Sequence, residues 1–332
     1  MTTMKDVAVK AGVGLGTVSR VINNAGPVKD STRRKVERVI KELNYQPNEA
    51  ARNFKMQQSL SIALIVPTVW HPFYSEFSYY VERELLNNNY KTILCNSQNE
   101  VEREIQYITM LQKNKIDGII AITYSKEIDQ YVTSNLPMVS IDRHFTEDVV
   151  NITSDHYSGG FLAASELSKR GCKHIGYIGS VSSIKNESML RRKGFEDYVN
   201  NAKVLSSVHE VIEPVKDLSK VIVSFLEENP TVDGLFCMND KWAIEAISVC
   251  KNMNKKVPED IQIIGFDGAK MSKDASVSHS TIEQPIQKLA KTAAQSLIKL
   301  INGKEVERRI ILPVKFKAGN STKSLDIKTE LT

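Results

Sequence analysis

From Ser61 onward, short apolar runs alternate with helical stretches, and this alternation restricts the fold more than any other feature. The runs have the length of buried strands: "IALIV" (62–66), "KTILCNS" (91–97), "DGIIAIT" (117–123), "PMVSID" (137–142), "KHIGYIG" (173–179), "DGLFCM" (233–238) and "IQIIGFD" (261–267). Apolar strands that alternate with helices form parallel sheets with helices on both faces. The sequence therefore predicts an α/β body with two parallel, doubly wound sheets.

The length of 332 residues exceeds what one ordinary core accommodates and suits two or three domains. The alternating part, residues 60–332, fits two lobes of about 100 residues each. We expect the chain to cross between them near Asp155, Gln284 and Gly319. The predicted first lobe comprises residues 60–155 and 286–318, and the predicted second lobe comprises residues 156–285 and 319–332.

Positive charge is concentrated in the first 59 residues. They carry eleven lysines and arginines against five acidic residues, so this piece has a charge of +6 and the rest of the chain −1, within a total of +5. A small basic piece on a nearly neutral body is typical of a module that binds a polyanion, although a solubilising basic surface is the alternative.

Several classes of protein are excluded by what the sequence lacks. It has no apolar run of the roughly 20 residues that span a membrane, and "MTTMKDVAVK" has no signal-peptide pattern. Its four cysteines form no CxxC pair, its six histidines have no metal-ligand spacing, and GxSxG is absent. We expect a cytoplasmic, nucleoid-associated protein that is not an enzyme, with no catalytic residue, metal, cofactor or membrane contact.

Three glycines at alternate positions, in "AGVGLGTVSRVINN" (11–24), raise the question of a phosphate-binding loop. A dinucleotide fingerprint needs a strand before its glycines. Here the preceding residues have a helical pattern, and Thr3 with Asp6 resembles a capping box. The GxxxxGK[ST] pattern also fails, because Thr17 follows Gly16 with no lysine between them. The phosphate interpretation is therefore rejected.

A helix-turn-helix is the remaining interpretation. A first helix is predicted from about Met4 to Lys10, and Gly12 takes the turn, where a positive φ costs little only for glycine. The second helix begins near Leu15 and turns its valines and isoleucine inward: Val18, Val21 and Ile22.

A third helix, "STRRKVERVIKELNY", is predicted to be capped by Ser31. Its apolar residues have helical spacing: Val36, Val39, Ile40 and Leu43. Three short helices with the second exposed suit the major groove of DNA. Residues 1–46 are therefore predicted to form an all-α DNA-binding domain, and residues 47–59 a hinge helix or linker.

The segments "MKDVAVKAGVGLGTVSRVIN" and "VKDSTRRKVERVIKELNYQPNEAARNF" resemble the start of the lactose-repressor (LacI/GalR) family of transcription regulators. Weaker fragments continue the resemblance, among them "HPFYSEF", "SIDRHF", "MNDKWAIEAI" and "IIGFDG", and "TSDHYSGG" is similar to sucrose and related disaccharide repressors. The resemblance implies a helix-turn-helix domain followed by two lobes like those of periplasmic sugar-binding proteins. It implies a homodimeric repressor that binds pseudo-palindromic operator DNA under the control of a small carbohydrate between the lobes.

The resemblance also assigns DNA-binding residues. Leu15, Gly16 and Arg20 fall where the family reads base edges, and Thr17 and Ser19 where it touches phosphates; Asn23 belongs to the same set. Gly14 stands where the family often has a capping serine, and Gly16 provides no side chain for base reading.

The hinge "YQPNEAARNFKMQQS" is expected to lie in the minor groove, with Asn48, Ala51 and Phe54 as contacts. Phe54, where the family usually has leucine, is predicted to act as a wedge between base pairs, and packing between two hinge helices is the alternative.

Polar residues gather where predicted strands end, which is where parallel sheets bind ligands. These residues are Asp142, Arg143, Asn239, Asp240 and Asp267, and Arg191 lies early in a helix after another strand. Carboxylates accept hydrogen bonds from sugar hydroxyls, and arginine donates them. By resemblance, Asp142, Arg191, Asn239 and Asp267 contact the effector. Asp240 is interpreted instead as the cap of a helix starting at Lys241.

Aromatic side chains are candidates for the apolar side of a sugar ring. They are Phe73, Tyr74, Trp242 and Phe266, of which Phe73 is included in the predicted effector site. A place in the core is the alternative for Trp242 and Phe266.

The main alternative function is a catabolite-control-type regulator whose co-repressor is the phosphorylated phosphocarrier protein. The helix 71–88 and the helix from Ile286 are the surfaces for such a partner. A purine effector is a lesser alternative. The tail "STKSLDIKTELT" has no sustained leucine heptad, so a dimer without a coiled-coil tetramerisation segment is expected.

Overall fold

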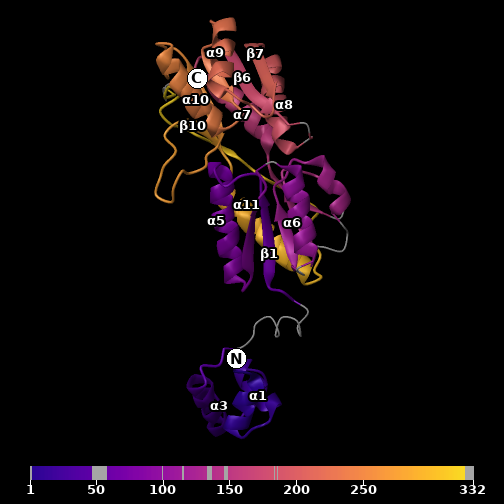
Figure 1. The fold of residues 1–332 in the computed structure, drawn as a ribbon. Helices are drawn as coiled ribbons and strands as arrows, with labels where there is room; N and C mark the ends of the chain where they lie inside the picture. Colours follow the sequence, from indigo (N-terminus) through magenta and orange to yellow (C-terminus); the bar gives the residue numbers. More distant parts are fainter. Residues whose placement is uncertain are drawn as a thin grey trace. The chain divides into compact units, whose positions relative to one another are not determined.

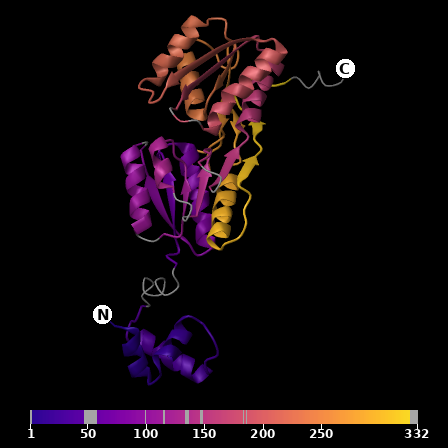
Figure 2. The same ribbon diagram turned by 90° about the vertical axis from the view of Figure 1, so that its right-hand side faces the viewer.

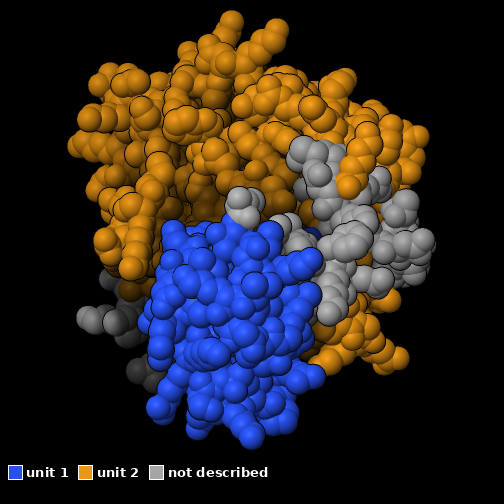
Figure 3. All heavy atoms as spheres, turned by 60° about the horizontal axis from the view of Figure 1, so that its bottom comes forward, with its two compact units in different colours: residues 1–59 blue, residues 60–332 orange. Residues whose placement is uncertain are grey.

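The computed structural model describes residues 2–46, 58–98, 100–113, 116–132, 137–145, 149–182, 184 and 186–325. The chain divides into two compact units, Met1–Ser59 and Leu60–Thr332 (Figure 3). The predicted hinge positions Asn48, Ala51 and Phe54 lie outside the described residues.

The first unit contains three helices, α1 (Met4–Ala11), α2 (Leu15–Ile22) and α3 (Asp30–Glu42). Thr3 and Asp6 form the predicted capping box, and Gly12 ends α1 with a φ of 60°. Val18 and Val21 pack into the small core of this unit with Val36 and Val39. The helix-turn-helix prediction is therefore confirmed.

The predicted start of the third helix is wrong. α3 begins at Asp30, and Lys29, which makes no side-chain capping bond, precedes it in place of Ser31. A carboxylate in the first turn is favourable at the positive end of the helix dipole, so Asp30 joins the helix instead of preceding it.

The second unit contains two lobes, each built around one six-stranded sheet (Figure 1). The first sheet has the order β11-β5-β4-β3-β1-β2 and consists of β1 (Ser61–Val66), β2 (Lys91–Asn96), β3 (Gly118–Ala121), β4 (Met138–Ile141), β5 (Val150–Ser154) and β11 (Arg309–Leu312). The second has the order β12-β10-β9-β8-β6-β7 and consists of β6 (His174–Val181), β7 (Leu205–Ile212), β8 (Gly234–Cys237), β9 (Gln262–Asp267), β10 (Ser280–Glu283) and β12 (Lys315–Lys317). All pairings are parallel except that of β12 with β10.

Helices cover both faces of each sheet, as the alternating pattern predicts. In the first lobe, α5 (Pro72–Asn87) and α11 (Ile286–Ile301) bury one face, and α6 (Val101–Lys113) and the 3-10 helix η1 (Lys126–Tyr131) the other. In the second lobe, α9 (Leu218–Glu228) and α10 (Asp240–Asn252) bury one face. The other face is buried by α7 (His156–Lys169) and α8 (Leu190–Ala202). A short 3-10 helix, η2 (Glu187–Met189), comes directly before α8.

The chain passes between the lobes after β5, after β10 and after β11 (Figure 2). Asp155 and Gln284 stand at the first two passages, as predicted. The third lies between Leu312 and Lys315, earlier than the predicted Gly319, because "RRIILPVKFK" forms one strand in each sheet. Pro313, which has no N–H to donate to a ladder, falls between the two strands.

Candidate functional site

Four buried side chains meet where the lobes join, and together we call them the lobe junction: Asp142, His156, Arg191 and Asp267. Asp142 follows β4 of the first lobe, whereas the other three belong to the second lobe. His156 Nε2 lies 2.9 Å from Asp142 Oδ1, and Arg191 Nε lies 3.1 Å from His156 Nδ1. Arg191 Nη2 lies 3.6 Å from Asp267 Oδ1. Three predicted effector residues are thus brought together, with a histidine that the prediction did not include.

α7 and α8 lie side by side (Figure 1). Their close approach puts Arg191 Nε 3.1 Å from His156 Nδ1. A Cβ added at Gly160 would stand 1.8 Å from the carbonyl oxygen of Arg191, and one at Gly194 would stand 2.0 Å from that of Tyr157. Only glycine at these two positions allows the backbones to come so near. The helix-to-helix contact therefore brings the first turn of α8 against the start of α7.

The guanidinium of Arg191 has several partners besides His156. Its Nη1 donates to the carbonyl oxygen of Met238 at 2.6 Å. Its carbon Cζ lies 3.7 Å from the centre of the Phe266 ring, which is buried in the second-lobe core. A cation over an aromatic face is attracted by the ring quadrupole, so Phe266 supports the arginine from the core side.

Both junction carboxylates stand on unusual backbone. Asp142 has a φ of 57° and Asp267 a φ of 117°, in the left-handed region that side chains rarely adopt. Ile152 and Glu187 hold the Asp142 backbone, because Asp142 N donates to Ile152 O at 3.1 Å and Glu187 N donates to Asp142 O at 2.9 Å. Gln284 donates both its N–H and its side-chain amide to Asp267, at 2.9 and 2.7 Å. Such strain persists where the surroundings over-determine it, and it concentrates at functional sites.

The two carboxyl groups differ in protonation because their partners differ. Burial acts against ionisation of Asp142, but bonds from His156 and Thr153 and the charge of Arg191 keep its pKa below the usual value. Burial raises the pKa of Asp267 to about 7, against the effect of Arg191 and with that of Asp240. Near neutral pH, Asp142 therefore accepts hydrogen bonds, whereas a protonated Asp267 can also donate one.

The first lobe adds a polar rim near the junction. Burial, together with the nearby second-lobe cations Lys241 and Arg191, lowers the pKa of His71 to about 4, so His71 is neutral. The hydroxyls of Tyr74 and Tyr124 lie 3.4 Å apart. Among the described residues, the buried atoms without a hydrogen-bond partner include His71 Nδ1 and Gln284 Oε1. These atoms are suited to hydrogen bonds with the hydroxyls of a ligand.

Other predicted residues have different surroundings. Phe73 is buried in the first-lobe core, with its ring 6.2 Å from that of Phe77. Asn239 Oδ1 caps α10 by accepting from Trp242 N at 3.1 Å. The prediction that Asp240 caps this helix is wrong, because Asp240 is its first residue and accepts from Thr281 Oγ1 at 2.6 Å and from Gly268 N at 2.8 Å. It joins α10 to the end of β9 and to β10.

Arg143 and Trp242 also lie outside the lobe junction. Arg143 turns into the first lobe, where it donates to Ser125 O at 2.6 Å and to Asp129 Oδ1 at 2.5 Å. Trp242 is buried in the second-lobe core, which supports the core alternative.

Sequence reasoning missed His156, His71 and Tyr124. Single histidines without metal spacing are usually surface or core residues, so the sequence alone gives neither histidine a role. The available signal was position: His156 follows the predicted passage at Asp155, and His71 and Tyr124 stand just after strands of the first lobe.

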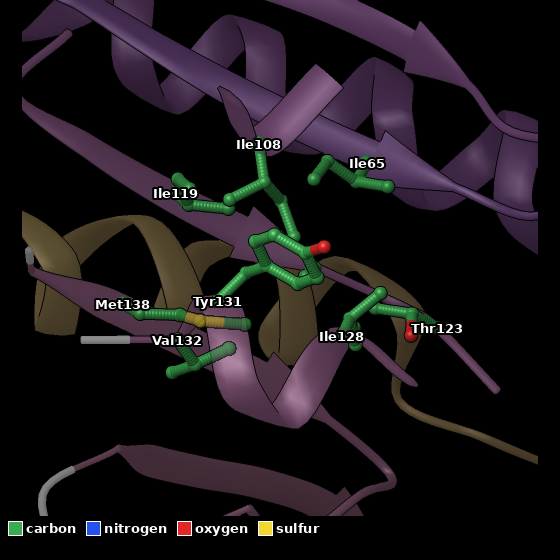
Figure 4. A pocket seen from close by; sticks show the side chains of 9 residues that line it. Ile65, Ile108, Ile119, Thr123, Ile128, Tyr131, Val132 and Met138 are labelled. Carbon is green, nitrogen blue, oxygen red and sulfur yellow. The ribbon is translucent and has the colours of Figure 1, made fainter. Parts of the chain in front are cut away.

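Two pockets of the described part of the chain lie away from the lobe junction. One is inside the first lobe, where the ring of Tyr131 lies among Ile65, Ile108 and Ile128 (Figure 4). Its lining is apolar apart from two hydroxyls, those of Tyr131 and Thr123, so it does not suit a polyhydroxyl ligand. The other lies between β7 and α9, beside Pro214 and Lys220.

The exposed face of α2 consists of the residues predicted to meet DNA. Leu15 is 52% exposed, and Gly16, Arg20 and Asn23 are exposed as well, whereas Thr17 and Ser19 are half-buried. Asn23 Nδ2 donates to Ser19 O at 2.9 Å across the last turn. Gly14 begins the helix without a side-chain cap, as predicted. Within the described ranges, no helix is long and apolar enough to cross a membrane.

Comparisons with known proteins agree with this division of the chain. A model of bacterial regulatory proteins of the lacI family matches residues 3–48, and one of periplasmic binding protein-like domains matches residues 164–322. The ribose operon repressor of Halalkalibacterium halodurans is 34% identical over 97% of this chain and 98% of its own length. The sucrose operon repressor of Streptococcus mutans is 35% identical over 96% of this chain and 98% of its own length.

A solved structure is similar to the two lobes. A periplasmic binding protein/LacI transcriptional regulator from Alkaliphilus metalliredigens, complexed with D-xylulofuranose, superposes with a TM-score of 0.73 at 30% identity. The match covers 80% of this chain and 100% of that chain.

Proposed function

This chain belongs to the lacI family of bacterial regulatory proteins and is a DNA-binding transcriptional repressor, and from that premise we propose that a small carbohydrate bound between its lobes controls its affinity for operator DNA. The observation that carries the proposal is the lobe junction. There, an ionised carboxylate, a carboxyl group with a pKa of about 7 and a guanidinium converge from two lobes. Such a set donates to and accepts from the adjacent hydroxyls of a sugar.

The proposed effector contacts are Asp142, Arg191, Asn239 and Asp267. Phe73 belongs to the same proposed site, and the centre of its ring lies 5.5 Å from that of Tyr74. His71 Nδ1 and Gln284 Oε1 add polar atoms that lack a partner among the described residues. Because the junction side chains are almost fully buried, a ligand reaches them when the lobes move apart. Lobe opening and closing is thus the two-state change that the effector biases, through its different affinity for the two states.

A disaccharide or a pentose is the effector class that we favour. The similar repressors from Streptococcus mutans and Halalkalibacterium halodurans are named for sucrose and ribose operons, and the similar solved regulator holds a ketopentose. Sucrose, D-ribose and their phosphates are therefore the first ligands to test.

On the DNA side, we propose that α2 enters the major groove. Leu15, Gly16 and Arg20 face base edges, whereas Thr17, Ser19 and Asn23 face the backbone. The charge of +6 in the first 59 residues supports this binding mode. Asn48, Ala51 and Phe54 are proposed as minor-groove contacts from the hinge.

We propose that the repressor is a homodimer joined through the outer strand β2 and the neighbouring helix α5. Leu94 of β2 is 50% exposed, and Tyr79 and Leu86 of α5 are 42% and 61% exposed. Leu94 points to the α5 side of the sheet, because its neighbour Cys95 packs in the core on the α6 side. An outer strand with exposed apolar side chains is suited to cover by a second copy. Two copies supply two α2 helices for a pseudo-palindromic operator.

Thermal unfolding of the purified protein with a panel of sugars, sugar phosphates and purines tests the effector. A ligand at about 100 times its Kd adds about 2.7 kcal/mol of stability. We expect a sugar to stabilise the protein and to change its affinity for operator DNA. Asp267→Ala is expected to lose that response while keeping DNA binding. If only purines stabilise the protein, the sugar proposal is rejected in favour of a purine effector. If the whole panel is inactive, it is rejected as well, and the phosphorylated phosphocarrier protein is the next candidate.

A further inference from the structure

His156 occupies a position that spans the two lobes. It is the first residue of α7, directly after the passage at Asp155, and its side chain is completely buried. Each ring nitrogen has one partner: Nε2 meets Asp142 Oδ1 at 2.9 Å, and Nδ1 meets Arg191 Nε at 3.1 Å. Asp142 stands on the first sheet, whereas Arg191 stands on a helix of the second lobe. The imidazole therefore lies between one polar group from each lobe.

The chemistry of the partners determines the proton positions. An arginine N–H donates and never accepts, so Nδ1 of His156 must be the acceptor in its contact with Arg191. The proton of the neutral ring is then on Nε2, which donates to Asp142. Arg191, His156 and Asp142 thus form a chain of hydrogen bonds that all point in one direction. Neighbouring bonds in such a chain polarise one another.

Both ends of this chain are held firmly. Asp142 also accepts from Thr153 Oγ1 at 2.7 Å, and its backbone carbonyl accepts from Glu187 N of the second lobe at 2.9 Å. Arg191 is held by Met238 O and by the ring of Phe266. A change in the hydrogen bonding of Asp142 is therefore passed to Arg191 through the imidazole and is not absorbed by a loose side chain.

We infer that His156 is a positioning residue that couples Asp142 of the first lobe to Arg191 of the second. The relevance of this coupling to the effector rests on the proposed function, because both residues are proposed effector contacts. In the free protein, the coupling presents the guanidinium and the carboxylate in one relative orientation. Preorganisation of this kind raises affinity by removing the entropy cost of ordering the two groups on binding.

The test is nitrogen NMR on the ligand-free, full-length protein labelled with ¹⁵N in histidine and arginine. The His156 ring is expected to show a protonated Nε2 and an unprotonated Nδ1 at neutral pH. Asp142→Asn is expected to shift the Arg191 Nε resonance in the wild-type background and to leave it unchanged in the His156→Leu background. His156→Gln is expected to restore part of the shift, because an amide supplies one donor and one acceptor.

His174→Leu is the matched control. His174 is also buried and bonded at both nitrogens, at 2.8 Å to Thr231 and 2.9 Å to Ser207, but both partners lie in the second lobe. It is expected to leave the coupling between Asp142 and Arg191 intact. Should His156→Leu not fold, the tautomer in the wild-type protein and the response of His156→Gln decide the question.

Two results would overturn the inference: a protonated Nδ1 in His156, or a shift of Arg191 Nε of equal size in the wild-type and His156→Leu backgrounds. Titration with sucrose and D-ribose then separates the inference from the proposed function. If the coupling exists and one of these sugars binds the wild-type protein, His156→Leu is expected to raise the Kd of that sugar about 10-fold or more. This is the loss typical of a hydrogen bond to a charged group. Unchanged sugar affinity in His156→Leu overturns the positioning role. Failure of both sugars to bind the wild-type protein counts against the proposed effector class, while the NMR result still decides the coupling.

Discussion

At the scale of the residue, burial alone does not decide how a carboxyl group behaves, because its hydrogen-bond donors and neighbouring charges compete with burial. Asp142 and Asp267 are equally buried, at 4% exposure. Asp142 receives bonds from His156 and Thr153 and keeps a lowered pKa, whereas Asp267 faces a second carboxylate, Asp240, and has a pKa of about 7. The type and order of these residues are visible in the sequence, but their partners come from distant segments. Their protonation therefore required the structure.

Asp267 is expected to make the free energy of unfolding depend on pH. Its folded pKa of about 7 exceeds the usual aspartate value of 3.8, so the folded state binds more protons between these two pH values. The contribution of Asp267 to the free energy of unfolding therefore falls as the pH rises from about 4 to about 7, by at most about 1.4 kcal/mol per pH unit.

In urea unfolding, Asp267→Asn should lose this dependence. Asp142→Asn is the control and should keep most of it, because the Asp142 charge is a lesser cause of the raised Asp267 pKa. The pKa of Asp142 itself is lowered, so its own contribution is lost only in acid. A wild-type slope in Asp267→Asn would show that another group titrates.

Arg20 is the residue of α2 for which base recognition is most testable. Replacing it with alanine is expected to cost about 1–3 kcal/mol of site-specific DNA binding, the usual worth of a bidentate contact to guanine. Fluorescence anisotropy with specific and scrambled duplexes measures the loss. Arg34→Ala removes the same charge from exposed surface of α3 and should weaken both duplexes alike. Equal losses for Arg20→Ala on both duplexes would make Arg20 a phosphate contact.

At the scale of the element, the contact between α7 and α8 determines whether the lobe junction exists. The two glycines that permit it are visible in the sequence only as single letters within helices. Gly160 belongs to the segment "TSDHYSGG", in which nothing local indicates that it faces the Arg191 carbonyl. That contact joins residues from two helices, so it is a tertiary property.

Gly160→Ala is expected to force α7 and α8 apart. Its Cβ would stand 1.8 Å from a backbone oxygen, which cannot rotate away as a flexible side chain can. Overpacking of this kind costs about 1–3 kcal/mol of unfolding free energy, measured in urea. It should also disturb the Arg191 resonance. Ser168→Ala, on the same helix but only partly buried, should change stability by less than about 0.5 kcal/mol.

Gly14→Ser is expected to stabilise α2. Gly14 has a φ of −68°, which any residue adopts, and nothing lies within 4 Å of an added Cβ. A serine there supplies the missing cap and reduces the entropy of the unfolded chain. Together these effects are expected to raise the free energy of unfolding by a few tenths to about 1 kcal/mol. Slower hydrogen exchange of the α2 amides measures the gain. Gly14→Ala is the control without the hydroxyl, and equal protection in both variants would exclude capping as the cause.

At the scale of the whole molecule, the lobes and the proposed dimer are the two levels of assembly. Leu94→Glu is expected to convert the dimer to a monomer of 37.3 kDa, because it places a charge in the proposed apolar contact. Analytical ultracentrifugation measures the mass. Ile212→Glu is the matched control on the outer strand of the other sheet, where Ile212 is 78% exposed, and it should remain dimeric. If Ile212→Glu gives monomers and Leu94→Glu does not, the dimer interface lies on the second lobe instead.

The amino-acid sequence was enough to predict the α/β architecture, the helix-turn-helix and two of the three passages between lobes. These follow from periodicity, caps and turn residues, which act over a few neighbours along the chain. It did not identify β5, β7 and β10 as strands, because "VNITS", "LSSVHEVI" and "STIE" mix polar with apolar residues. It also placed the last passage too late, because Pro313 divides one apolar run between two sheets. Only the tertiary structure decided the partners of Asp142, His156, Arg191 and Asp267, since hydrogen bonds and burial depend on which distant segments the fold brings together.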